Sequence, residues 1–289
     1  MAGKIEPYVR RINNVFIESL LTGQLHGFLV LAKTNPNVCL EIRKNYINLY
    51  YRGGNAALIS HRRITNSFIC KFDEKYCFNK PEPSAPEILS ILEKGDPSDF
   101  LINFETITHE MDTWLDFHFN AERDFQHNLI KINQGKLRII DIEYAGQTID
   151  KHRFRIDMIA IYSDLNGDKL VLIENKYGNN LDGASGLRKH FNDFSTIVND
   201  SETYNQLIHS VNNIIQIKRK LGLVDWNQEP LLNPCTEVLF ILANFSQDIN
   251  YVRKVMRQEQ LSVPVKVIIL PPADTKLTAA IDYENAITL

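Results

Sequence analysis

Three segments with the composition of β-strands follow one another closely in the middle of the chain. They are KLRIIDIEYA (136–145), RFRIDMIAIYS (153–163) and KLVLIENKY (169–177). Residues 164–168 join the second to the third, and their Asn-Gly pair is a strong signal for a tight hairpin turn. Strands joined by so short a turn run antiparallel. The sequence therefore predicts an antiparallel meander, around which the rest of the fold must be arranged.

The segments on either side of this meander extend it into a larger domain. Apolar residues three and four positions apart predict a helix over about 106–133 and another over about 202–221. The apolar segment TEVLFILANF (236–245) predicts a strand buried on both faces, and a helix near 251–259 and the strand VKVIIL (265–270) come after it. The order of helix, three strands, helix and strand predicts a domain of the α/β class.

The first part of the chain has a different character. It predicts a helix over about 8–21 and then short strands, with Gly53-Gly54-Asn55 as a hairpin turn. The strands are HGFLVLA, NVCLEIR, NYINLYYRG, NAALISH and NSFICKF. Three prolines in KPEPSAPEILS (80–90) interrupt regular structure, and an excess of basic residues gives way there to an excess of acidic ones. We therefore expect an N-terminal α+β module (1–80), a linker (81–105) and a second domain (106–289).

The composition excludes several classes of protein. Of the 289 residues, 44% are hydrophobic and 23% are charged, which is typical of a folded globular protein. We expect a cytoplasmic location, because the N-terminus lacks the pattern of a secretion signal and the apolar runs are much shorter than a membrane span of roughly 18 residues. The four scattered cysteines indicate reduced thiols, and the net charge of -3 does not indicate a nucleic-acid binder.

Charged residues interrupt two of the meander strands at positions that should bring them together. Side chains alternate between the faces of a strand, so Asp157 lies on one face with Arg155 and Ile159, inside an apolar run. Glu174 and Lys176 share a face near the end of the next strand. A carboxylate buried in a strand requires a counter-ion, a hydrogen-bond network or a metal.

Two carboxylates on adjacent strands would form an oxygen-donor site suited to Mg²⁺ or Mn²⁺. A phosphodiester could complete the coordination shell, while Lys176 could orient a water molecule or neutralise the transition state. The bland alternative is that Glu174-Asn175-Lys176 is a chance tripeptide that forms only a cross-strand ion pair. The buried strand and the position of Asp157 in the hairpin partner favour the functional interpretation.

These residues resemble a known family. Arg155-Ile156-Asp157, a hairpin and then Leu172-Ile173-Glu174-Asn175-Lys176 are similar to the motif of the PD-(D/E)xK nuclease superfamily. The resemblance covers about 106–245 and implies a restriction-endonuclease-like core of helix, three-strand meander, helix and strand. Ile156 stands where the family often has proline. The resemblance assigns Asp157, Glu174 and the backbone carbonyl of Asn175 to metal binding. It assigns Lys176 to assisting the nucleophilic water.

The resemblance also suggests residues outside the motif. Many members add a glutamate from the preceding helix, and Glu122 is the candidate because its spacing to Phe125 and Leu129 places it near the buried stripe. It could instead be an exposed helix acid, and Glu110 and Asp116 are its rivals. Gln206 and Lys189 are candidates for substrate binding, although basic clusters such as 188–190 are more often simply solvated.

These inferences lead to an expected function. We expect a Mg²⁺-dependent or Mn²⁺-dependent nuclease that hydrolyses phosphodiester bonds, with DNA favoured over RNA because the resembling family acts mostly on DNA. A role in prokaryotic defence or DNA processing is a further hypothesis, and the N-terminal module would bind the substrate, a partner protein or a second copy. The competing hypothesis is a nuclease fold retained as a non-catalytic binding or assembly module.

Overall fold

A computed structural model of the protein describes most of the chain in two compact units. The described residues are 9–78, 89, 92–132, 135–148, 153–165, 167–181, 186–226, 230–232, 234–256, 263–272 and 280–289. The four-stranded unit consists of Arg10–Asn120 and Asn213–Gln228. The six-stranded unit is built from Met1–Val9, Ala121–Asn212 and Glu229–Leu289. Each unit has its own sheet, and the protein belongs to the mixed α/β class.

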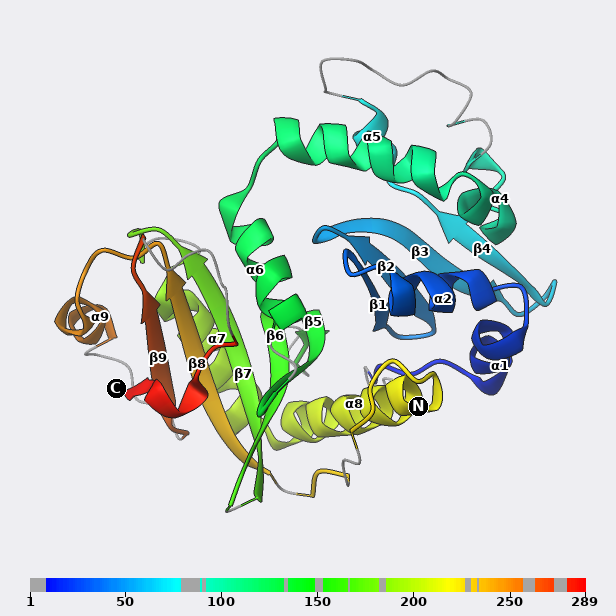
Figure 1. Ribbon diagram of the computed structural model, residues 1–289. Coiled ribbons are helices and arrows are strands. Elements are labelled where there is room, and N and C mark those ends of the chain that lie inside the picture. Colours follow the sequence, from blue (N-terminus) through cyan, green and yellow to red (C-terminus); the bar gives the residue numbers. More distant parts are fainter. Residues whose placement is uncertain are drawn as a thin grey trace. The chain divides into compact units, whose positions relative to one another are not determined.

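In the four-stranded unit, helices come before and after an antiparallel sheet along the chain (Figure 1). The sheet has the order β1-β2-β3-β4, as expected for successive hairpins. The elements are α1 (Asn14–Thr22), α2 (His26–Thr34), β1 (Val38–Ile42), β2 (Tyr46–Tyr51), β3 (Gly54–Arg62), β4 (Ser67–Lys71), η1 (Glu74–Cys77), α4 (Pro97–Ile102) and α5 (Phe104–Phe117).

Two predictions for the beginning of the chain are wrong. The segment HGFLVLA forms α2 and not a strand, because burial of Leu25, Phe28 and Leu29 follows a helical spacing of three and four. The first helix begins at Asn14, where the Asn13 side chain caps it by accepting a hydrogen bond from the Phe16 N–H at 2.9 Å. The tertiary packing of α2 overrides the strand propensity of its Phe, Leu and Val residues.

The hairpin turn between β2 and β3 lies one residue earlier than expected. Tyr51 pairs with Gly54, so the two turn residues are Arg52 and Gly53. Both have positive φ angles, 47° and 73°, as the twist of a two-residue hairpin requires. The Arg52 guanidinium reaches α5, where it forms ion pairs with Asp112 at 2.7 Å and Asp116 at 2.8 Å.

The helix expected over 106–133 is in fact two helices. α5 ends at Phe117, and α6 (Ala121–Ile132) begins the six-stranded unit. Phe119, which the spacing placed on a buried stripe, lies in the break and is 67% exposed. The units therefore divide near residue 120, and α4 and α5 belong with the first sheet. Residues 81–88, 90 and 91 of the expected linker lie outside the described residues, and 97–105 are mostly helical.

The six-stranded unit contains the expected meander. Its elements are α6, β5 (Leu137–Gln147), β6 (Arg153–Asp164), β7 (Gly167–Tyr177), α7 (Leu187–Asn199), β8 (Cys235–Ala243), α9 (Ile249–Met256), β9 (Val265–Leu270), η3 (Tyr283–Asn285) and β10 (Ile287–Thr288). The strand order is β10-β9-β8-β7-β6-β5. β5, β6 and β7 run antiparallel, while β7, β8 and β9 run parallel. Asn166 of the expected turn lies outside the described residues.

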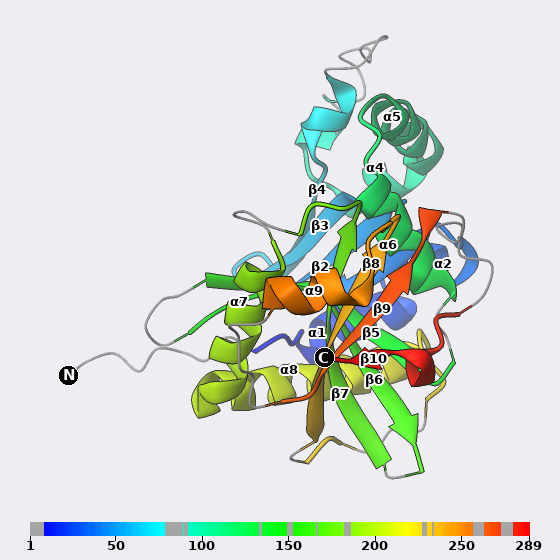
Figure 2. The same cartoon turned by 90° about the vertical axis from the view of Figure 1, so that its left-hand side faces the viewer.

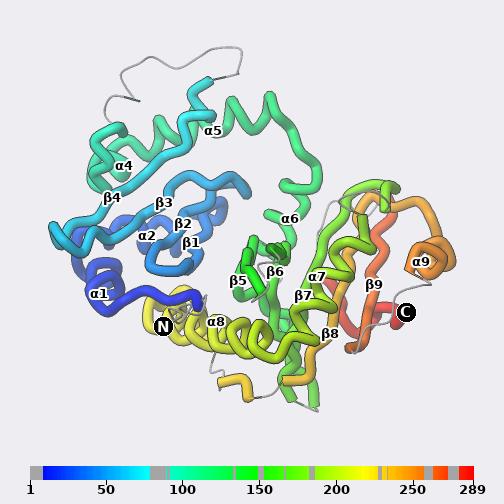
Figure 3. The backbone as a smooth tube through the Cα atoms, turned by 180° about the vertical axis from the view of Figure 1, so that it is seen from behind, coloured from blue at the N-terminus to red at the C-terminus, as the bar shows by residue number. Residues whose placement is uncertain are grey.

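Helices cover the parallel part of this sheet. α7 was not expected from the sequence, although its buried Leu187, Phe191, Phe194 and Ile197 follow a helical spacing. α7 lies on the face of the sheet that is turned toward the viewer in Figure 3. α9 contacts α7 (Figure 2), and Arg188 Nε donates a hydrogen bond to the Val255 carbonyl at 2.8 Å. α8 (Ser201–Lys220) follows directly and contributes residues to both units.

The sequence also led us to expect reduced cysteines and apolar segments too short to span a membrane. The four cysteines are free thiols, as expected. Among the described residues no single helix is long and apolar enough to span a membrane, whereas α1 and α2 pass that test together as a pair bent by 66°.

Candidate functional site

The register of β6 and β7 determines where the predicted carboxylates lie. The two strands pair from Asp164 opposite Gly167 to Met158 opposite Ile173, so the next opposing residues are Asp157 and Glu174. Opposing residues of an antiparallel pair project from the same face. The strand pairing ends at this point, and the Asn175 N–H instead donates to Asp157 Oδ2 at 3.1 Å.

Two nitrogen-bearing side chains approach the Glu174 carboxylate. Lys176 Nζ lies 2.7 Å from Glu174 Oε1, because residues two apart on a strand share a face. His190 Nε2, from α7, lies 2.9 Å from the same oxygen. Neither contact has the geometry of a hydrogen bond, and among the described residues neither Glu174 oxygen and neither His190 ring nitrogen has a hydrogen-bond partner. The site thus holds several buried polar atoms without directed partners.

The site is buried, and this changes its electrostatics. Glu174 is fully buried, and Asp157 and Lys176 are 7% and 9% exposed. Burial, together with the nearby Glu174 carboxylate, raises the pKa of Asp157 to about 7. The Asn175 N–H, Lys176 and Arg155 oppose this rise in pKa, but the Arg155 guanidinium is 60% exposed and lies 3.9 Å from Asp157 Oδ1. A divalent cation at this place would relieve the repulsion between the two carboxylates.

Helix α6 contacts the same strand ends from the opposite face. Gln126 Nε2 donates to the Asp157 carbonyl at 3.2 Å. The Asn175 side chain points to the opposite face of the strand from that of Glu174, and its Nδ2 donates to the Glu122 carbonyl at 3.5 Å. Glu122 is therefore next to the site through its backbone, and its carboxylate makes no ion pair or hydrogen bond with the described residues. Of its rivals on α5, Asp116 pairs with Arg52.

The two residues suggested for substrate binding are not brought into contact with the trio of Asp157, Glu174 and Lys176 by any described interaction. Gln206 Nε2, on α8, contacts Glu202 Oε1 one turn earlier at 3.4 Å. Lys189, on α7, is half exposed and pairs with Asp193 at 2.7 Å. Both contacts are local pairs within one helix, of the kind that commonly stabilises a helix surface.

Sequence reasoning missed two residues that contact the site. His190 was treated as part of a solvated basic cluster, but its side chain is only 14% exposed and lies against Glu174. Recognition of α7 from its apolar spacing would have placed His190 on the helix next to the predicted strand. Gln126 lies one turn after Glu122 on α6, and its role as a donor to a strand carbonyl has no sequence signal that we can identify.

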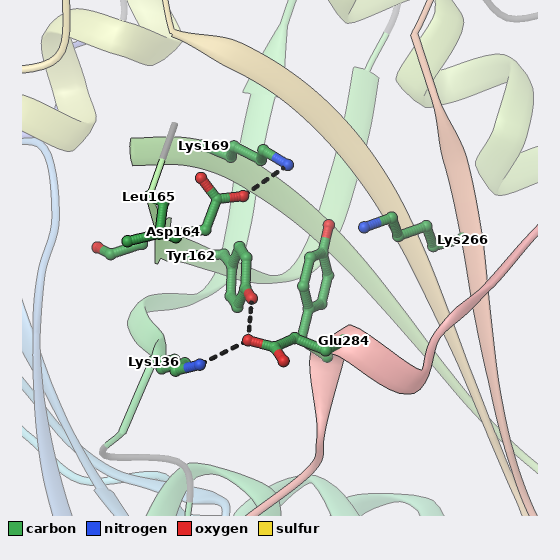
Figure 4. A pocket seen from close by; sticks show the side chains of 9 residues that line it. Lys136, Tyr162, Asp164, Leu165, Lys169, Lys266 and Glu284 are labelled. Carbon is green, nitrogen blue, oxygen red and sulfur yellow. Dashed lines mark hydrogen bonds and ion pairs between the residues drawn. The ribbon is translucent and has the colours of Figure 1, made fainter. Parts of the chain in front are cut away.

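A separate cluster of charged and aromatic side chains lies at the other end of these strands, where β6 ends and β7 begins. A cavity of about 550 Å³ is lined there by three lysines, two tyrosines and two acids, together with Ser163 and Leu165 (Figure 4). Lys136 and Tyr162 both contact Glu284, and Lys169 contacts Asp164. Each lysine is already paired with a carboxylate in the described residues, so this network holds the C-terminal segment and does not present free charge to an anion.

The donor set of the candidate site is small. Among the described residues no three or more His, Cys, Asp and Glu side chains form a group that could hold a metal ion by themselves. A metal at Glu174 would therefore need backbone, water or substrate oxygens in addition, which is the usual mode of Mg²⁺ binding.

Comparisons with known proteins add little to this geometry. No family model matches the chain, and no curated protein matches it. Among solved structures the chain is similar to SfsA of Pyrococcus furiosus in complex with Ca²⁺, at 12% identity over 88% of this chain and 90% of that chain. The TM-score is 0.23, a value that does not establish a common fold.

Proposed function

We propose that this chain is a metal-dependent nuclease of the PD-(D/E)xK type that hydrolyses phosphodiester bonds. The observation that carries this proposal is the burial of Asp157 and Glu174 beside each other, with Lys176 on one of the two carboxylates. Like charges placed together in a buried site destabilise the fold, and such arrangements are concentrated at functional sites.

The order of elements around the trio supports the same proposal. α6 precedes β5, β6 and β7, and helices α7 and α8 separate β7 from the parallel strand β8. This is the order of the restriction-endonuclease-like core that the motif implied. The trio lies where β6 and β7 stop pairing, so the Asp157 carboxylate is free to turn toward the end of β7.

The residues present fit a divalent ion, Mg²⁺ or Mn²⁺. Both Glu174 oxygens are buried, and neither has a hydrogen-bond partner among the described residues; such atoms are costly unless a ligand satisfies them. Asp157, Glu174 and the backbone carbonyl of Asn175 would hold the ion. Mg²⁺ needs only one or two carboxylates because it retains water and binds substrate phosphate, so the absence of a third acidic ligand among the described residues is compatible with it.

The chain's own residues would divide the work of hydrolysis. A bound ion would supply Lewis acidity, which lowers the pKa of a water molecule and stabilises charge on the phosphate. Lys176 would orient the attacking water and stabilise the negative charge that develops as the new P–O bond forms and the bond to the leaving oxygen breaks. Glu122, whose backbone carbonyl lies beside the Asn175 side chain, would act as an additional acid. Gln206 and Lys189 would contact the substrate backbone.

The substrate and the biological role are proposed on weaker grounds. DNA is favoured over RNA because members of the resembling superfamily act mostly on DNA, and a role in defence or DNA processing follows the same reasoning. The four-stranded unit, with its exposed Arg62 and Arg63 on the β3–β4 hairpin, would supply backbone contacts or a partner surface.

A nuclease assay with matched variants tests this function. Supercoiled plasmid, single-stranded DNA and RNA would each be incubated with the full chain and Mg²⁺ or Mn²⁺. We expect Asp157→Ala and Lys176→Ala to reduce cleavage by about 100-fold or more. Lys254→Ala, which removes an exposed lysine from α9, is the control and should retain full activity.

The outcomes separate the proposal from its alternative. Equal cleavage by wild type and both site variants would reject the site assignment. If the wild type binds DNA but cleaves none of the substrates with either ion, the chain is a non-catalytic binding module with a nuclease fold.

A further inference from the structure

The contact between His190 and Glu174 has an unusual geometry for two polar side chains. His190 Nε2 and Glu174 Oε1 are 2.9 Å apart, which is the usual length of a hydrogen bond. The imidazole side chain is 14% exposed and the glutamate side chain is 1% exposed. Neither atom has a hydrogen-bond partner in the part of the chain that the structure describes, so the oxygen does not lie along the direction of a ring N–H.

Two ligands of one metal ion produce this combination of distance and direction. In an octahedral site with bonds of about 2.1 Å, adjacent ligand atoms are about 3.0 Å apart. The line that joins the two ligand atoms then makes an angle of roughly 45° with the bond from either atom to the metal. This is too far off line for a good hydrogen bond between them. The 2.9 Å contact between His190 and Glu174 matches the separation of adjacent ligands.

The two side chains come from elements that hold them in place. Glu174 lies in β7, where it is paired with Phe240 of β8 and follows the last residue that pairs with β6. His190 lies in the first turn of α7, where its neighbours Leu187 and Phe191 are buried and Arg188 is hydrogen-bonded to α9. Donors on rigid elements keep their geometry without the ion.

We propose that His190 Nε2 binds the same divalent ion as Glu174 Oε1 and makes this site prefer a first-row transition ion over Mg²⁺. The inference rests on the proposed function, because it concerns the ion that the nuclease site would use. Imidazole nitrogen is a poor ligand for Mg²⁺ and Ca²⁺, which take oxygen, but a good one for transition metals. In the metal-free chain, Lys176 Nζ, 2.7 Å from the same oxygen, neutralises the charge that the ion would neutralise.

Metal binding to the full chain tests this inference without reference to cleavage. Metal-stripped protein would be titrated with Mn²⁺ and with Mg²⁺ by calorimetry at one fixed pH, and the Mn²⁺ complex would be examined by pulsed EPR for coupling to a directly bound nitrogen. The variants are His190→Ala, His190→Gln and the control His209→Ala, which removes an exposed imidazole from α8.

We expect the wild type and His209→Ala to bind Mn²⁺ at least about tenfold more tightly than Mg²⁺ and to show the nitrogen coupling. His190→Ala should lose the coupling and about tenfold in Mn²⁺ affinity, with Mg²⁺ affinity changed less than about twofold. His190→Gln restores a polar side chain of similar length, so it should fold normally and bind both ions without the preference for Mn²⁺.

Two results would overturn the inference and leave the proposed function intact. One is Mn²⁺ binding by the wild type without nitrogen coupling, and the other is an unchanged preference for Mn²⁺ in folded His190→Gln. By contrast, failure of the wild type to bind either ion would remove the metal site on which the proposed function depends, and the inference with it.

Discussion

The Asn175 N–H donates a hydrogen bond to Asp157 Oδ2 at 3.1 Å, across the point where β6 and β7 stop pairing. A side-chain oxygen thus takes the place of a strand carbonyl as acceptor. The bond brings the Asp157 carboxylate toward the end of β7 and beside Glu174, whose charge helps to raise the pKa of Asp157.

Replacement of Asp157 by asparagine should stabilise the metal-free protein and abolish activity. The folded-state pKa of about 7 lies above the ordinary aspartate pKa of 3.8, so between these two pH values the folded state binds more protons than the unfolded state. Stability is therefore lost as pH rises from about 4 to 7, and the loss is complete above that range. Asparagine keeps an oxygen acceptor for the Asn175 N–H but carries no charge.

Urea denaturation in EDTA at pH 5 and pH 8 measures this effect. Each pKa unit corresponds to about 1.4 kcal/mol, so the gain at pH 8 could reach about 4 kcal/mol and should be smaller at pH 5. A loss of stability in Asp157→Asn at pH 8 would show that the carboxylate is not destabilising in the folded state.

A divalent ion should stabilise the fold, and the effect should require the carboxylates. At 100 times the dissociation constant, a ligand that binds only the folded state contributes about 2.7 kcal/mol. We expect Mg²⁺ or Mn²⁺ to raise the melting temperature of the wild type but not of Glu174→Gln. An equal shift in both proteins, measured by differential scanning calorimetry, would place the binding of the ion elsewhere.

A buried ion pair in the four-stranded unit should be costly to break on one side. Lys218 Nζ contacts both Glu41 oxygens, at 3.0 Å and 2.9 Å, and both side chains are less than 10% exposed. Lys218→Met should destabilise the protein by about 3–5 kcal/mol, because it leaves a buried carboxylate with one partner fewer. The double variant Lys218→Met with Glu41→Gln should recover part of that loss in chemical denaturation, and a purely additive result would contradict the pairing.

The C-terminal segment should loosen at acid pH. Burial alone would raise the pKa of Glu237, but hydrogen bonds from Tyr283, Lys266 and Lys169 outweigh burial and lower it. A lowered folded-state pKa gives stability that is present above the unfolded-state pKa and is lost as pH falls through the folded-state value.

Hydrogen exchange of residues 280–289 reports this attachment directly. We expect protection at pH 7 and faster exchange, corrected for the intrinsic rate, below about pH 4, near the ordinary pKa of glutamate. Glu237→Gln should show fast exchange already at pH 7, whereas Glu202→Gln, an exposed control on α8, should not. Equal protection in wild type and Glu237→Gln would mean that backbone pairing of β10 alone holds the segment.

Local signals in the sequence determined the central part of this protein. The alternation in 153–163 and 169–177 and the short turn between them determined that β6 and β7 pair, and with that pairing the common face of Asp157, Glu174 and Lys176. These features depend only on the period of a strand and the geometry of a hairpin, and neither requires knowledge of distant residues.

Only the tertiary structure decided which other side chains reach the trio and how the chain divides. The placement of His190 depends on α7 packing against the sheet, and that of Gln126 on α6 packing against the other face. The grouping of α5 with the first sheet includes the pairing of Arg52 with Asp112, sixty residues away. Such contacts join segments far apart in sequence, and their energies come from packing and charge pairing that no local pattern encodes.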